Sequence, residues 1–168
     1  MELLNRPLAR YVVPNSVWHE TLAELRTRSL HAQEGLVFWL GVVQEQDAYV
    51  RRCWVPVVAA TATRVAVRSE EVARMVLAAT DREEVVLAQV HSHLGAAFHS
   101  SVDDSGSVSL RKGFLSVVVP RGGDIQEPGE ALFFEHLGGT CWRRLARQEV
   151  AERIRLFDSH ECAPDVRP

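Results

Sequence analysis

The 168-residue chain has few cysteines, and they form no recognisable framework. Cys53, Cys141 and Cys162 are odd in number and widely separated, and no CxxC pair exists. This spacing argues against a disulfide scaffold. We therefore expect idle thiols in a reducing, cytoplasmic location.

The chain also lacks long apolar runs and an excess of basic charge. Its longest apolar stretch, residues 35–43, is too short to span a bilayer, and no basic start leads into an apolar secretory signal. The formal net charge of -3 leaves no electrostatic footprint for nucleic acid. We expect neither a membrane nor a nucleic acid as a partner.

Several familiar zinc-enzyme patterns are missing as well. There is no His-Glu-x-x-His helix, which excludes the common metalloprotease arrangement. There is no Pro-Cys-x-x-Cys, as a nucleobase deaminase would have. The chain is too short for the barrel of an amidohydrolase.

The composition, with 46% hydrophobic and 24% charged residues, is that of an ordinary globular protein of one domain. We place this domain at residues 1–157 and expect a disordered, polar C-terminal tail at 158–168. The pattern predicts an α/β fold, a sandwich with a curved, mostly antiparallel sheet flanked by helices. The expected strands are 10–13, 35–44, 48–59, 64–67, 84–92, 113–119, 131–137 and 140–145. We expect Asn15 or Ser16 to cap the first helix, a second helix to begin at Ser69 with Val72, Met75, Val76 and Ala79 on its buried face, a short helix to begin at Ser101, and a last helix to run from Arg147 to Phe157.

The residues that could bind a metal or take part in catalysis are concentrated in one segment, VVLAQVHSHLGAAFHSSVDD at residues 85–104. Side chains alternate along a strand, so His91 and His93 point the same way and Ser92 points oppositely. Two such imidazoles can reach one ion, and Asp104 can add a carboxylate oxygen. Two His and one Asp leave a fourth position for water, as in catalytic zinc sites.

Such a water needs a group that manages its proton, and Glu34 is the best candidate. It stands directly before the apolar strand at 35–44 and can reach the water if the two strands are neighbours. Ser101 can donate a hydrogen bond to an oxyanion.

Blander interpretations remain for each of these residues. Ser101 and Asp104 also fit a helix-capping pattern, which is compatible with the metal role. Asp103 can replace Asp104 as ligand, and Glu34 can be an exposed strand-entry residue. His99 fits a loop surface or a substrate contact.

Together, these residues match the pattern E…H-[ST]-H-x7-S-x2-D, and the chain thereby resembles the JAMM (JAB/MPN) zinc metalloprotease family. LVFWLG after Glu34, GFLSVVVP at 113–120 and FFEHLGGTCWRRL at 133–145 extend the likeness over roughly residues 9–157. One departure is Leu94, where the family often has Pro.

The resemblance implies a cytidine-deaminase-like α/β sandwich and a single catalytic Zn²⁺. His91, His93 and Asp104 would be its ligands, Glu34 the general acid/base, and Ser101 the oxyanion donor. The implied activity is a deubiquitinase-like isopeptidase or peptidase that cuts after the C-terminal Gly of a ubiquitin-like protein.

The implied partners are that protein or its conjugates, with the activating and conjugating enzymes of the same system. Small bacterial members of this kind occur beside ubiquitin-like conjugation machinery, including antiviral defence systems. A peptidase that processes a sulfur-carrier protein would use the same residues, and an inactive MPN-type scaffold is the alternative from another functional class.

Overall fold

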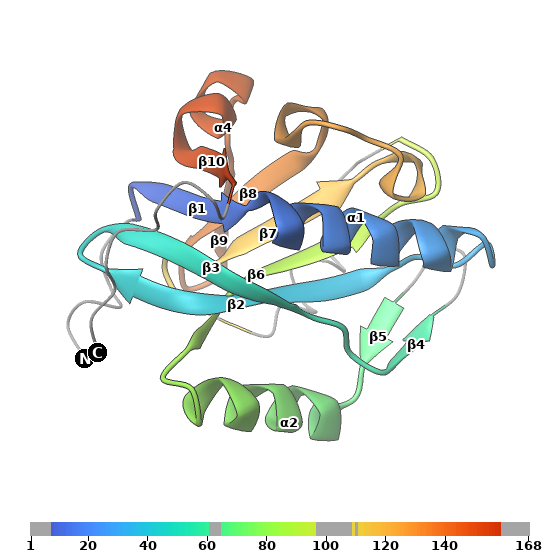
Figure 1. The fold of residues 1–168 in the computed structure, drawn as a ribbon, viewed down its shortest axis with the longest axis horizontal. Coiled ribbons are helices and arrows are strands. Elements are labelled where there is room, and N and C mark those ends of the chain that lie inside the picture. The colour runs from blue at the N-terminus through green and yellow to red at the C-terminus, as the bar shows by residue number, and fades with distance from the viewer. Residues whose placement is uncertain (1–7, 61–64, 97–108, 110, 159–168) are drawn as a thin grey trace.

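The computed structural model describes residues 8–60, 65–96, 109 and 111–158. Eight strands form one strongly curled sheet in the order β10-β1-β3-β2-β6-β7-β8-β9, while β4 and β5 form a separate hairpin (Figure 1). The strands of the large sheet are β1 (Arg10–Pro14), β2 (Leu36–Gln44), β3 (Asp47–Trp54), β6 (Val85–Ser92), β7 (Leu115–Val119), β8 (Leu132–Gly138), β9 (Cys141–Arg144) and β10 (Ile154–Phe157). The hairpin strands are β4 (Val58–Ala60) and β5 (Val65–Val67).

Helices cover both faces of the sheet. Helix α1 (Asn15–Ser29) lies on one face and α2 (Ser69–Thr80) on the other, as Figure 1 shows. The short α4 (Arg147–Arg153) leads directly into β10, and two 3₁₀ turns, η2 (Arg121–Gly123) and η3 (Pro128–Glu130), connect β7 to β8. Among the helices that the structure describes, none combines the length and apolar character needed to cross a membrane.

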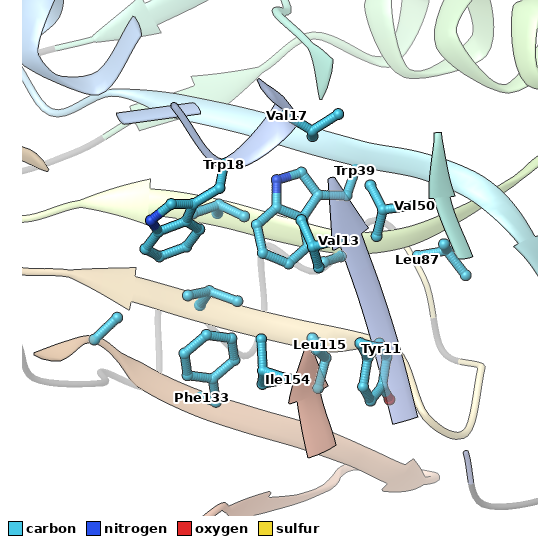
Figure 2. Close-up of a cluster of buried hydrophobic side chains, with 14 of the residues drawn as sticks. Tyr11, Val13, Val17, Trp18, Trp39, Val50, Leu87, Leu115, Phe133 and Ile154 are labelled. Atoms are coloured by element: carbon cyan, nitrogen blue, oxygen red, sulfur yellow. The ribbon is translucent and has the colours of Figure 1, made fainter. Parts of the chain in front are cut away.

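The main core lies between the sheet and α1. Trp18 of α1 meets Trp39 of β2 edge to face, with ring centroids 6.2 Å apart (Figure 2). Below them, Leu115 and Phe133 from β7 and β8 fill the curve of the sheet. A smaller cluster around Phe38, Leu40, Met75 and Ala79 packs α2 onto the opposite face. Strands β2 and β7, which are buried on both faces, are accordingly almost entirely apolar in sequence.

The α/β fold class is confirmed, with antiparallel pairing at four boundaries of the large sheet and parallel pairing at three. The predicted return strand 48–59 is broken, because β3 ends at Trp54 and Val58 begins the separate hairpin. Val76, predicted to be buried, is 44% exposed on α2. Of the predicted tail, only Asp158 lies among the described residues.

Two local predictions were wrong at the chain's helices. The helix expected from Arg147 to Phe157 ends at Arg153, and the next four residues form β10, which pairs in parallel with β1. The long-range pairing overrides the local helical pattern. At α1, the cap position belongs to Pro14 and has no side-chain hydrogen bond, whereas Asn15 donates to Asp158 instead.

A buried ion-pair network ties β8 and α4 to β1. Glu135 of β8 accepts hydrogen bonds from Arg153 at 2.6 Å and from Arg143 at 3.0 Å, and its side chain is only 5% exposed. Arg153 also donates to the carbonyls of Leu8 and Ala9 at the entrance to β1. Because β8 and β1 are not adjacent in the sheet, this network connects two strands that share no backbone hydrogen bonds.

Replacing Glu135 with Gln should lower the free energy of unfolding by roughly 3 kcal/mol, since it leaves buried guanidinium charge unneutralised. Chemical denaturation measures this change. Glu24→Gln, which breaks the more exposed pair with Arg28, is the matched control and should cost less than about 1 kcal/mol. Equal losses in both variants would contradict the role given to the network.

Candidate metal centre

Three neighbouring strands, β2, β6 and β7, have a terminus at the same end of the sheet. Strand β2 begins where β6 and β7 end, because β2 runs antiparallel to β6 and β6 runs parallel to β7. In this register Leu36 pairs with His91, and His91 pairs with Val118. The His93 N–H donates to the carbonyl of Val119 at 2.9 Å, so the alignment continues past the last residue of β6.

Ser92 fixes the start of β2 against the end of β6. Its backbone N–H donates to the Gly35 carbonyl at 3.0 Å, and its hydroxyl accepts a hydrogen bond from the Gly35 N–H at 3.0 Å. The side chain is fully buried. Ser92, which stands between the two histidines, is thus bonded to Gly35, the residue after Glu34. If the same register continues by one more residue, Glu34 lies opposite His93.

Alternation places the three candidate side chains on one face of the sheet. Leu36 packs against the α2 cluster, and directly paired residues of antiparallel strands share a face. His91, paired with Leu36, therefore lies on the α2 face, and so do His93 and Glu34, each two residues along its strand. All three are buried, with Glu34 8%, His91 4% and His93 6% exposed.

The two imidazoles fit a shared ion. Their ring centroids are 5.3 Å apart and their planes are inclined by 46°. Two imidazoles that bind one tetrahedral Zn²⁺ at about 2.0–2.1 Å place their centroids roughly 5 Å apart. The spacing therefore suits two nitrogen ligands of a zinc ion, and the burial of both rings restricts solvent around it.

A complete ligand set is not formed by the described residues. Within them, no group of three His, Cys, Asp or Glu side chains could hold a metal ion. Ser101, Asp103, Asp104 and His99 lie outside the described residues, so their predicted roles stay predictions.

The remaining described histidines and the thiols were not predicted as metal ligands. His19 and His31 are exposed, while His136 is buried on β8 with its ring nitrogens near the carbonyls of Arg111 and Gly139. Cys53 and Cys141 are free, and burial raises the pKa of the Cys53 thiol to about 12. Neither thiol is a competing ligand for the pair of histidines.

One polar pair beside the site was missed from the sequence. Gln89 donates to the hydroxyl of Ser116 at 3.1 Å, and both side chains are buried. Gln89 lies on the same face as His91 because it pairs with Phe38 of the α2 cluster. The signal was present as polar residues at every second position, Gln89, His91 and His93, in an otherwise apolar strand.

Comparison with known proteins adds a relative and a shared fold. No family model matches the chain. It is 36% identical over 102 residues to a protein of Sinorhizobium fredii (strain NBRC 101917 / NGR234) named "Probable metalloprotease y4jG". The chain is thus similar to a protein named as a metalloprotease. The match covers 58% of this chain and 63% of that protein, which is less than two thirds of its length.

The solution structure of protein DSY2949 from Desulfitobacterium hafniense has the same fold. The TM-score is 0.63 at 16% sequence identity, and the superposition covers 90% of this chain and 97% of that one. At this identity the likeness concerns the fold alone. It confirms the α/β architecture on which the candidate centre is built.

Ser92→Ala should free the Gly35 amide and lower the free energy of unfolding by about 1–2 kcal/mol, since a buried N–H loses its acceptor. Hydrogen exchange of the Gly35 amide should rise. Ser116→Ala is the matched control: it also removes a buried hydroxyl, but from a strand that does not pair with β2. Unchanged Gly35 exchange in Ser92→Ala would show that the hydroxyl does not fix this strand end.

Proposed function

We propose that this protein is a zinc-dependent peptidase of the JAMM type, with His91, His93 and Asp104 as the metal ligands. The observation that carries the proposal is the pair of buried imidazoles, 5.3 Å apart, on the strand face shared with Glu34. The relative named as a metalloprotease supports the same class of activity. Zinc suits a mixed imidazole and carboxylate donor set.

Zinc, when bound, supplies a Lewis acid and an activated water for attack on a peptide carbonyl. Glu34 then acts as the general base, and its carboxylate takes the proton of the attacking water. The same carboxyl returns that proton to the departing amine. The burial of Glu34, and its place two residues before Leu36 on the strand face shared with His91, support this role.

Ser101 completes the proposed set by donating its hydroxyl to the oxyanion of the tetrahedral intermediate. The short sequence distance between Ser101 and Asp104 allows one helical turn to carry both groups. Their segment follows directly from the loop that leaves His93. We expect this segment to supply a metal ligand and an oxyanion donor at the end of the sheet where β2 begins and β6 and β7 end.

The substrate we propose is the C-terminal Gly of a ubiquitin-like protein, joined to a target by an isopeptide bond or to a short precursor tail. We expect such a tail to bind in an extended form, as a strand added beside the sheet. Strand β3 runs toward the candidate centre and leads into the β4–β5 hairpin, so an extended segment has strand backbone nearby. A role in antiviral defence belongs to this proposal and depends on the genetic neighbourhood.

Glu34→Gln should lower kcat by on the order of 10²–10⁴-fold while zinc stoichiometry stays the same, because only the proton carrier is lost. His93→Ala should lose both zinc and cleavage. The assay measures zinc content and cleavage of a ubiquitin-like fusion and of an isopeptide conjugate, with and without a chelator. His19→Ala, which removes an exposed histidine, is the control and should match the wild type.

Cleavage that persists in Glu34→Gln, or after complete removal of zinc, would refute the mechanism. Cleavage confined to the short tail of a sulfur-carrier protein would identify the processing peptidase. A stoichiometric complex whose function survives His91→Ala would identify a scaffold.

A further inference from the structure

The η2 turn is bonded to the strand end that carries His93. The N–H of Gly122 donates to the carbonyl of His93 at 2.8 Å, and the N–H of Arg121 donates to the carbonyl of Gly95 at 2.8 Å. These two bonds bracket the point where the chain leaves β6 and enters the segment toward Asp104. The position of η2 thus constrains both His93 and the start of that segment.

The turn has a backbone that needs external support. Arg121, Gly122 and Gly123 have φ values of 52°, 62° and 99°, three consecutive residues in the left-handed region. A Cβ on Gly122 would collide with the Ser29 hydroxyl, so the turn packs directly against the last residue of α1. Glycine adopts such φ values at little cost, so the strain falls on Arg121, which surrounding contacts must hold in this conformation.

Arg26 of α1 supplies such contacts. Its Nε donates to the carbonyl of Gly123 at 3.0 Å, and its Nη2 donates to the carbonyl of Ile125 at 3.1 Å. One planar guanidinium therefore spans the end of the turn, a geometry that a single ammonium group cannot reproduce. The residue is otherwise exposed, so its replacement removes two hydrogen bonds without opening a cavity in the core.

We infer that Arg26 is a positioning residue of the metal centre: it holds η2, and η2 holds His93 and the chain that leaves it. The inference rests on the proposed function. The path from Arg26 to His93 runs through two hydrogen bonds from the Arg26 side chain to backbone carbonyls, two backbone–backbone hydrogen bonds and the packing of Gly122 on Ser29. This gives α1, on the face opposite the candidate centre, a direct part in its geometry.

The test compares Arg26→Gln with Arg28→Gln. Arg28 lies on the same helix and bonds Glu24 instead of the turn, so it is a matched control. In metal-free protein, Arg26→Gln should speed hydrogen exchange at the amides of Arg121 and Gly122 on the order of tenfold, with little change in β2 and β6. Arg28→Gln should leave both amides at the wild-type rate.

With metal, Arg26→Gln should weaken zinc binding on the order of tenfold and change the visible spectrum of the cobalt-substituted protein, because the supporting shell of a ligand is loosened. Arg26→Lys should restore part of the zinc affinity, since an ammonium can reach one of the two carbonyls. A purely structural role would lower thermal stability without altering the cobalt spectrum below the transition.

The outcomes separate the two claims. A wild-type protein that binds no zinc overturns the proposed function and the metal role of Arg26 together. Unchanged exchange at Arg121 and Gly122 in Arg26→Gln overturns the inference alone. The inference is also overturned if exchange in Arg26→Gln is faster but its zinc affinity and cobalt spectrum equal those of Arg28→Gln. In either case, cleavage by the wild-type protein leaves the proposed function intact.

Discussion

The pairing register between β2 and β6 is the constraint on which the candidate centre depends. It sets Leu36 opposite His91 and, through the bonds between Ser92 and Gly35, Glu34 opposite His93. A slip by one residue would turn Glu34 to the α1 face and separate it from both imidazoles. The irregularity between Trp39 and Leu40 interrupts the ladder further along and helps to exclude such a slip.

The two faces of the central strands carry different kinds of side chain. The α1 face holds the large aromatic core, whereas Gln89 and His91 of β6, followed by His93 just past its end, lie in a row on the α2 face. These three polar side chains bury less apolar area than the aliphatic and aromatic residues of the α1 face, so hydrophobic burial stabilises the fold less on this face. The apolar core under α1 and the network around Glu135 compensate for this, a division expected where a fold carries a functional site.

Local pattern was enough to predict most strands, the α/β class and the common face of His91 and His93, because alternation and apolar runs are local properties. It was not enough for β10, whose strand form depends on pairing with β1 from the other end of the chain. The cap of α1 failed for a similar reason, since Asn15 bonds Asp158 near the C-terminus. The roles of Ser101 and Asp104 still rest on motif spacing.

The most direct test of the central claim is X-ray absorption spectroscopy at the zinc edge of the loaded protein. The account predicts one zinc ion per chain with two imidazoles and oxygen donors, all at about 2.0–2.1 Å. The Asp104→Asn variant should lose or weaken that site, and Asp103→Asn should retain it. A sulfur ligand at about 2.3 Å, or a spectrum unaltered by His91→Ala, would contradict the account.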